Sequence, residues 1–299
     1  MGGISQRLVW RIEALAYDIL SLAVKAVPFS ALSAFGGKLL RTIGPLSSKD
    51  HIARTNLRIA FPDISDAKLE ELMRAQWDNC GRTFAEFPAL HRLKAFSPNS
   101  QITVDGLEKL KAHNPAVLFT GHFANWEIMA LIMTQAGLPV QITYRKINNP
   151  YIDRRVRKKR QAYGTKLLVQ KSGVKGARQL IDAIERAESV ALLTDQKFNE
   201  GLSLPFFSQD AMTATGAVRL ALKTKRPLIP LSLTRNGANF HMTIHDPVDL
   251  VTSENKVQDT ENGVKQVNQF LETIIRAHPE QWFWVHRRWP KALYKKPQS

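Results

Sequence analysis

Beyond residue 100, short apolar runs alternate with segments in which apolar residues recur every three or four positions. The short runs predict strands at 101–104, 116–120, 140–144, 167–169, 190–194 and 228–233. The recurring patterns predict helices near 125–136, 150–163, 174–187, 213–224 and 261–277. Two further helical patterns, at 47–59 and 66–92, precede the first strand. This order predicts an α/β fold with a central mixed sheet flanked by helices.

The N-terminal segment 8–27 is mostly apolar, but charged residues interrupt it. Arg11, Asp18 and Lys25 stand seven residues apart, which places them within about 20° of one another per step around an α-helix. The spacing predicts a helix with one polar stripe, which lies among lipid headgroups or enters the bilayer with the stripe against protein. An amphipathic helix packed on the domain is the alternative. We expect a membrane-anchoring helix over 1–28 and one domain over 29–299.

The composition indicates an anionic partner. The 299 residues include 42 Lys and Arg against 26 Asp and Glu, a formal net charge of +16, so nucleic acid and anionic lipid both fit. The sequence has none of the motifs or glycine-rich reader loops of nucleic-acid-binding proteins, which favours an anionic membrane surface over nucleic acid. Cys80 is the single cysteine, which excludes a disulfide within the chain, and we expect it in the core.

The segment 121–127 connects the predicted strand at 116–120 to a predicted helix. Residues five apart on a helix diverge by about 140°, so His122 must lie in the turn if it is to meet Glu127 in the first helical turn. A carboxylate that holds one imidazole nitrogen leaves the other free to take a proton. Because an acceptor alcohol can itself be the nucleophile, such a pair suffices for acyl transfer without a covalent enzyme intermediate. A turn histidine bonded to the backbone is the structural alternative.

Three more polar residues are predicted to join this site. Arg160 shares a face of the 150–163 helix with Ile152 and Val156, so it should point inward, toward a protein carboxylate or a substrate phosphate. Asp195 and Gln196 follow a buried strand, at the edge where an α/β sheet delivers functional groups. A satisfied turn aspartate is the alternative for Asp195.

The C-terminal segment 279–289 combines aromatic and cationic side chains. This mixture predicts anchoring at a membrane interface, with aromatic rings at headgroup depth and arginines on phosphate. Around His122 the sequence offers no plausible set of three metal ligands. We therefore expect neither a metal nor a cofactor.

Several motifs, taken in order, resemble those of the bacterial lipid A biosynthesis acyltransferases, the late lauroyl and myristoyl transferases of the wider lysophospholipid acyltransferase-like family. With the N-terminal segment they span nearly the whole chain. They are Arg54-x-Asn56-Leu57 with Phe61-Pro62, Gly121-His122-x4-Glu127, Tyr144-Arg145 with Asn148-Asn149-Pro150, Asp195-Gln196, and Trp284-x-His286-Arg287-Arg288. Such a series is more specific than any one of its members.

The resemblance implies an acyltransferase domain over 29–299 that works at the cytoplasmic face of the inner membrane. It implies an acyl carrier protein thioester as donor and a Kdo-bearing, phosphorylated lipid A precursor as acceptor. It implies catalytic roles for His122 and Glu127 and substrate-binding or supporting roles for Arg145, Arg160, Asp195 and Gln196. Acylation of a glycerol phosphate or another lipid alcohol is the close alternative. A nonenzymatic basic protein that binds membrane or nucleic acid is the distant one.

Overall fold

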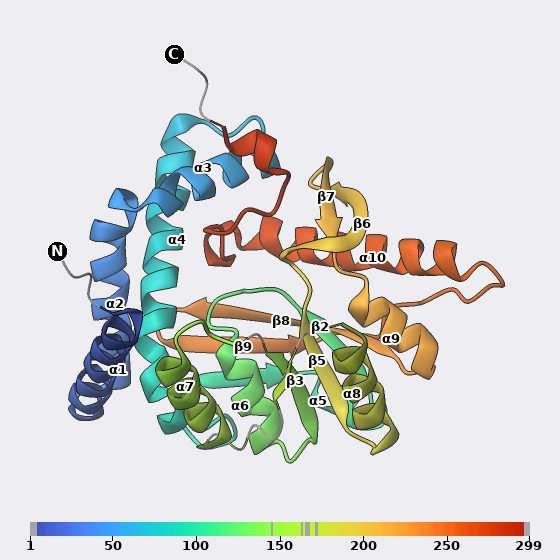
Figure 1. Ribbon diagram of the computed structural model, residues 1–299, viewed down its shortest axis with the longest axis horizontal. Helices are drawn as coiled ribbons and strands as arrows, with labels where there is room; N and C mark the ends of the chain where they lie inside the picture. Colours follow the sequence, from blue (N-terminus) through green and yellow to red (C-terminus); the bar gives the residue numbers. More distant parts are fainter. Residues whose placement is uncertain (1–4, 145, 163, 165–167, 171–172, 296–299) are drawn as a thin grey trace.

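The computed structural model describes residues 5–144, 146–162, 164, 168–170 and 173–295. Within these residues, one sheet has seven strands in the order β1-β9-β8-β2-β5-β3-β4 (Figure 1). Their bounds are Ile102–Asp105 (β1), Val117–Thr120 (β2), Val140–Tyr144 (β3), Leu168–Gln170 (β4), Ser189–Leu193 (β5), Leu228–Asn236 (β8) and Asn239–Ile244 (β9). Strands β8 and β9 pair antiparallel and the other neighbours pair parallel, which confirms the predicted mixed sheet.

Helices cover both faces of this sheet. The helices of the described chain are α1 (Gln6–Ala23), α2 (Phe29–Ile43), α3 (Ser48–Ala60), α4 (Asp66–Glu86), α5 (Leu107–Ala112), α6 (Glu127–Gln135), α7 (Pro150–Ala162), α8 (Gly173–Glu185), α9 (Gly216–Thr224) and α10 (Lys256–Ala277). Val117 and Phe119 of β2 pack in a core with α8, α9 and α10, whereas Leu118 packs in a second core with α5 and α6. Side chains alternate along a strand, so burial on both faces explains the continuous apolar runs.

All the predicted strands and helices form, with shifted ends; residues 163 and 167 of two predicted segments lie outside the described residues. The helix predicted over 66–92 ends at Glu86 and continues as the 3₁₀ turn Phe87–Arg92, because Pro88 lacks the N–H that an α-helix requires. The pattern missed α2, α5 and β9. It also missed a separate antiparallel ribbon made of β6 (Lys197–Phe206) and β7 (Gln209–Thr213).

Helix α1 turns its polar stripe toward α7. Arg155 Nε donates to Asp18 at 2.7 Å, and Arg11 Nε donates to the Tyr151 hydroxyl at 3.3 Å. The other side of α1 exposes a row of apolar side chains, namely Leu8, Ile12, Leu15, Ile19 and Leu22. No helix in the described part of the chain is both long and apolar enough to cross a bilayer. Two residues of the stripe, Arg11 and Asp18, therefore face protein, which is one of the arrangements that the sequence left open, whereas Lys25 lies beyond α1 and is exposed.

The C-terminal segment belongs to the core, so the predicted interfacial anchoring by this segment is wrong. Trp282, Trp284 and Trp289 have no exposed surface, and each indole N–H donates to an acceptor inside the protein. Arg288 is equally buried and donates to Thr213 Oγ1 at 2.7 Å. Aromatic and cationic residues suit an interface or a core with built-in acceptors, and only the tertiary contacts distinguish the two.

Helices α2 and α4 lie side by side (Figure 1), and they are in contact at two glycines, Gly36 and Gly81. A Cβ added at Gly81 would lie 2.1 Å from Gly36 O, and one added at Gly36 would lie 2.3 Å from Ala85 Cβ. The two backbones thus approach more closely than any side chain allows. This contact fixes α4 against α2, and α4 in turn lies beside the segment that follows β2, through a hydrogen bond from Thr83 to Ala124 O.

We expect Gly81→Ala to destabilise the fold by about 1–3 kcal/mol through overpacking, although alanine is the better helix former by about 1 kcal/mol. Urea unfolding followed by far-ultraviolet circular dichroism measures the difference. Lys38→Ala, at an exposed position of α2, is the matched control. Equal midpoints for the two variants would show that the crossing tolerates a side chain.

Candidate active site

Two neighbouring strands deliver the polar groups at the centre of the site. Strand β2 ends at Thr120 and α6 begins at Glu127, so His122 lies in the turn between them, as predicted. Strand β5 pairs parallel with β2 and ends at Leu193. Asp195 follows two residues later and meets the turn at the carboxyl edge of the sheet.

Asp195 binds His122 through both carboxylate oxygens. Oδ1 lies 2.7 Å from His122 Nδ1, while Oδ2 accepts the His122 backbone N–H at 2.8 Å and the Trp282 indole N–H at 2.8 Å. Burial by itself would raise the pKa of Asp195, but the charge of His122 and its hydrogen bonds hold that pKa well below its usual range. An ionised carboxylate only accepts, so Nδ1 carries a proton, and in the neutral ring Nε2 is then the nitrogen that can accept one.

Glu127 does not hold the imidazole, which corrects the pairing expected from the sequence. Its carboxylate is bound by Arg160 of α7, whose Nε donates at 2.9 Å and whose Nη2 makes a second bond. The Arg160 guanidinium also lies 4.8 Å from the centre of the Tyr144 ring. Arg160 therefore points inward as predicted, and its anion is a protein carboxylate. His122 instead turns to the end of β5, where the buried Asp195 requires donors.

A cavity of about 540 Å³ joins these groups. His122, Glu127, Arg160 and the exposed Gln196 line its polar part. The cavity extends between α6 and the sheet, where its lining is apolar and includes Met129, Met133, Val140, Ile142 and Leu231. A ligand with a polar reacting end and a long apolar chain matches this division. Arg145, the remaining predicted site residue, lies outside the described residues.

The C-terminal segment also contributes residues that contact His122 and its neighbours. The Phe283 N–H donates to His122 O at 3.1 Å, and the Phe283 ring packs against Trp126, which also contacts the His122 ring edge-on. His286 is half-buried in the same cluster, and the loss of hydration there lowers its pKa to about 4, so it is neutral at pH 7. Sequence reasoning missed Trp282 and Phe283 as site residues because it assigned their segment to the membrane interface.

Two other chemical groups were considered in the sequence. Cys80 is buried, and burial raises the pKa of its thiol to about 12, as suits a core residue rather than a nucleophile. Among the described residues no group of three or more His, Cys, Asp or Glu side chains is arranged to hold a metal ion.

Known proteins match this chain over most of its length. The lipid A biosynthesis palmitoleoyltransferase of Escherichia coli (strain K12) is 25% identical over 278 residues, covering 88% of this chain and 86% of that protein. The lipid A biosynthesis lauroyltransferase of the same organism is 25% identical over 296 residues, covering 92% of this chain and 90% of that protein. The crystal structure of a 1-acyl-sn-glycerophosphate acyltransferase from Thermotoga maritima covers 81% of this chain and 97% of its own at 15% identity, with a TM-score of 0.35. That structural likeness is too weak to support an inference.

The family assignment rests on a match that spans nearly the whole sequence. Residues 5–291 match the family model of the bacterial lipid A biosynthesis acyltransferase. This range contains the His122 turn, the buried Asp195 and the two-part cavity. The chain belongs to the bacterial lipid A biosynthesis acyltransferase family.

Proposed function

We propose that the protein transfers a fatty acyl chain from an acyl carrier protein thioester to a hydroxyl of a lipid A precursor. The observation that carries the proposal is the His122–Asp195 pair at the polar end of a cavity whose other end is apolar. The pair supplies a base for the hydroxyl, and the apolar end suits the acyl chain. The family match supports lipid A as the acceptor class.

His122 acts as the general base in this mechanism. Its Nε2 takes the proton of the acceptor hydroxyl while the oxygen attacks the thioester carbonyl carbon. The tetrahedral intermediate then collapses, the C–S bond breaks, and the leaving thiolate recovers the proton from His122. Asp195 holds the Nδ1–H tautomer and stabilises the imidazolium that forms between the two steps. No enzyme nucleophile is needed, because the acceptor supplies its own.

Glu127 and Arg160 form the second charged pair of the proposed mechanism. Both side chains line the cavity beside His122 and are largely buried, at 13% and 18% exposure. Arg160 offers positive charge where the thioester oxygen becomes negative, and Glu127 fixes its position. Gln196 is proposed as a substrate contact at the rim of the cavity, and the same role for Arg145 stays a prediction.

His122→Ala should lower turnover by about 10²–10⁴-fold, the usual contribution of a general base, and Glu127→Ala should lower it less. Asp195→Asn should lower turnover by a factor similar to that of His122→Ala, because the asparagine amide favours the opposite tautomer of the His122 imidazole. Mass spectrometry of the lipid product, made from acyl carrier protein and a lipid A precursor, measures each rate.

His113→Ala, on the exposed end of α5, is the matched control and should keep full activity. A folded His122→Ala enzyme with more than about a tenth of wild-type turnover would refute the general-base assignment. Acylation of a glycerol phosphate and not of the lipid A precursor would refute the acceptor.

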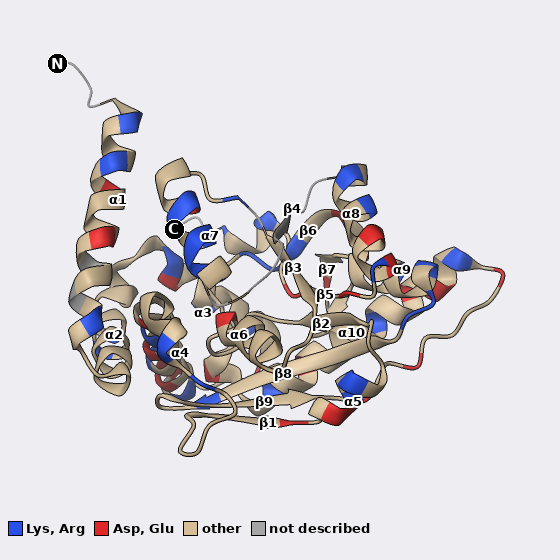
Figure 2. Cartoon of the chain, turned by 90° about the horizontal axis from the view of Figure 1, so that it is seen from below, with Lys and Arg blue, Asp and Glu red and all other residues tan. Residues whose placement is uncertain are grey.

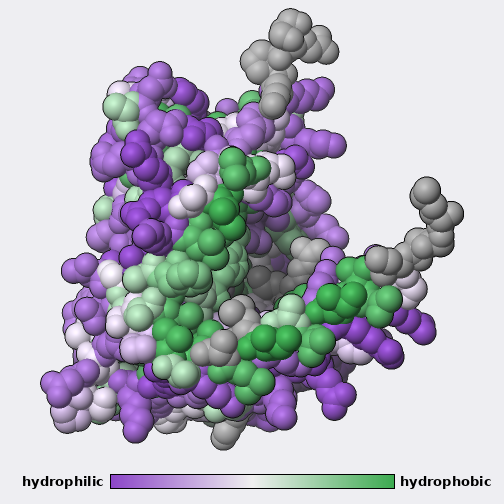
Figure 3. Space-filling model, turned by 90° about the vertical axis from the view of Figure 1, so that its left-hand side faces the viewer, coloured by the Kyte–Doolittle hydropathy of each residue, from purple (hydrophilic) through white to green (hydrophobic). Residues whose placement is uncertain are grey.

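The proposed site of action is the cytoplasmic face of the inner membrane, with the segment 1–28 as anchor. Figure 3 shows apolar side chains gathered in bands over α1 and α2. The exposed row on α1 continues on α2 with Phe35 at 65%, Leu39 at 43% and Ile43 at 46% exposure. A row of this extent is unusual on a surface that contacts only water, and it supports docking of both helices among lipid chains.

Leu15→Asp combined with Ile19→Asp should reduce binding to anionic vesicles at least about tenfold, because each carboxylate must lose its hydration to enter the apolar layer. Vesicle sedimentation across a salt series measures the affinity. Val257→Asp, which is 74% exposed on α10, is the control. Wild-type protein that stays in the supernatant at low salt would refute the membrane assignment.

Helix α7 offers a separate surface for the carrier protein. Its inward face carries Asp153, Val156 and Arg160, and its α1 side carries Arg155 and Lys159. The remaining exposed face carries three cations without an ion-pair partner among the described residues, namely Arg154, Arg157 and Lys158 (Figure 2). Acyl carrier proteins are acidic, so the charge of this face complements the charge of the donor. The face lies on the same helix that carries Arg160 into the wall of the cavity.

Replacing Arg154, Arg157 and Lys158 together by glutamate should raise the KM for the acyl carrier donor at least about tenfold and leave kcat nearly unchanged, because rim charges act on encounter. Steady-state kinetics measure both constants. The control replaces Arg219, Lys223 and Arg226, three exposed cations at α9, by glutamate. An unchanged KM with weaker vesicle binding would assign this face to the membrane instead.

A further inference from the structure

The turn that carries His122 contains a strained residue. Ala124 has a backbone φ of +45°, in the left-handed region that residues other than glycine rarely adopt. It stands between His122 and Glu127, the two residues with proposed catalytic roles. A strained residue at such a point persists only where surrounding contacts enforce its conformation.

Three hydrogen bonds from distant segments enforce it. The Ala124 N–H donates to Gln281 O at 2.9 Å, and the Thr83 hydroxyl donates to Ala124 O at 2.8 Å. The next residue, Asn125, is fully buried and donates from Nδ2 to Glu86 Oε2 at 2.8 Å. Thr83 and Glu86 are three residues apart on α4 and therefore lie on one face of this helix. That face bonds two consecutive residues of the turn, Ala124 and Asn125.

Arg235, at the end of β8, holds both of these α4 residues. Its Nη1 and Nη2 donate to the two oxygens of Glu86 at 2.8 Å each, and Nη2 also donates to Thr83 Oγ1 at 3.2 Å. The Glu86 side chain has no exposed surface and that of Arg235 is 5% exposed. Because Thr83 Oγ1 accepts from Arg235, its own proton is directed to Ala124 O. Ser33 of α2 donates a further bond to Glu86 at 2.6 Å.

We propose that Arg235, Glu86 and Thr83 are positioning residues that set the orientation of His122 and Glu127 by holding the strained turn. The inference rests on the proposed function for the identity of the reacting groups. None of the three lines the cavity that contains His122, so each acts through Ala124 or Asn125 and not on the substrate. In this proposal the buried Arg235–Glu86 pair selects one conformation of the turn, because any other would leave part of the pair without its hydrogen bonds.

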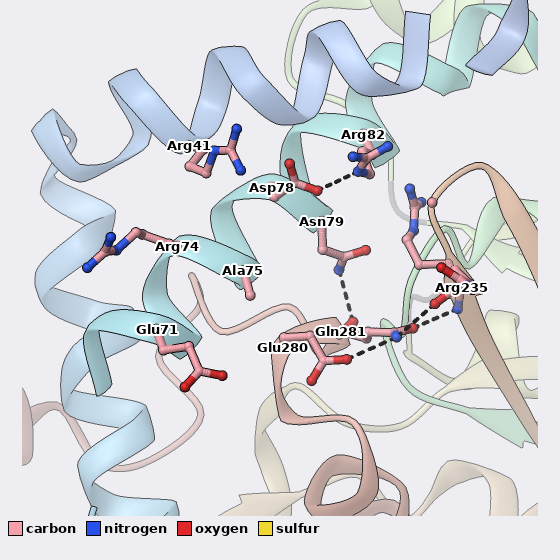
Figure 4. A pocket seen from close by; sticks show the side chains of 12 residues that line it. Arg41, Glu71, Arg74, Ala75, Asp78, Asn79, Arg82, Arg235, Glu280 and Gln281 are labelled. Carbon is pink, nitrogen blue, oxygen red and sulfur yellow. Dashed lines mark hydrogen bonds and ion pairs between the residues drawn. The ribbon is translucent and has the colours of Figure 1, made fainter. Parts of the chain in front are cut away.

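The structure also offers a way to test Arg235 chemically. A second cavity, of about 610 Å³, lies on the other side of this network, and Arg235 lines it together with Asn79, Arg82 and Gln281 (Figure 4). The Arg235 Nε and the Asn79 Oδ1 are buried and have no hydrogen-bond partner among the described residues. Truncation of Arg235 would leave a guanidinium-sized space in the wall of this cavity, facing Glu86. Free guanidinium can then enter from the cavity and bind the exposed carboxylate.

Arg235→Ala should lower kcat by about 10–100-fold, the effect of an ångström-scale displacement of catalytic groups, with little change in either KM. Guanidinium chloride at concentrations too low to denature should restore a large part of this loss. Thr83→Val, which keeps the shape of the side chain and removes the bond to Ala124 O, should lower kcat in the same range. Thr83→Val therefore tests the proposal even if Arg235→Ala does not fold.

Arg74→Ala is the matched control, because Arg74 lines the same second cavity and makes no contact with Glu86 or Thr83. Its kcat should equal that of the wild type, and guanidinium should not raise it. If Arg235→Ala lost only stability, guanidinium would lower its activity instead of restoring it. Wild-type kcat in folded Arg235→Ala and in Thr83→Val would overturn the proposal.

A spectroscopic readout separates this inference from the proposed function. The Nδ1 proton of His122, bonded to Asp195, should give a low-field NMR signal that His122→Gln removes. We expect Thr83→Val to shift or broaden this signal and Arg74→Ala to leave it unchanged. Wild-type protein that fails to transfer acyl groups would refute the proposed function, whereas an unmoved signal in Thr83→Val would refute the positioning role.

Discussion

Asp195 has no exposed surface, and its charge is compensated by hydrogen bonds from the His122 imidazole, the His122 backbone and the Trp282 indole. A buried carboxylate without such donors would be protonated or would destabilise the fold. The requirement joins three parts of the chain: the end of β5, the turn after β2 and the C-terminal segment. It also leaves the imidazole, which lines the cavity, with one nitrogen that bonds to none of the described residues. The same interaction thus stabilises the fold and prepares the proposed base.

The turn is held from its other side by α4, and the helix is placed there by its glycine contact with α2. Helix α2 carries part of the exposed apolar surface, so a continuous set of packed elements connects that surface to the His122 turn. Strain at Ala124 is tolerated because the Thr83 hydroxyl and the Glu86 carboxylate on α4, together with the Gln281 carbonyl, leave the turn no better conformation. Precision at the site therefore depends on helices that contribute no group to the cavity.

The sequence alone determined the mixed α/β class, the placement of His122 in a turn, and the inward direction of Arg160. These features depend on local periodicity and on chain geometry over a few residues, which a single sequence displays. It also pointed to Asp195, because an acidic residue after a buried strand lies at the edge where sites form. The motifs also suffice for the family, which the match of residues 5–291 to the family model confirms.

Which carboxylate meets which cation was decided only by the tertiary structure. His122 and Glu127 are close in sequence, yet Asp195 holds the imidazole and Glu127 binds Arg160, because strand pairing brings β5 beside β2. The burial of the tryptophan-rich C-terminal segment and the turn of the α1 stripe toward α7 likewise depend on partners more than 80 residues away. Composition describes what a segment can contact, whereas packing selects the contact by giving most buried polar groups a partner at the same time.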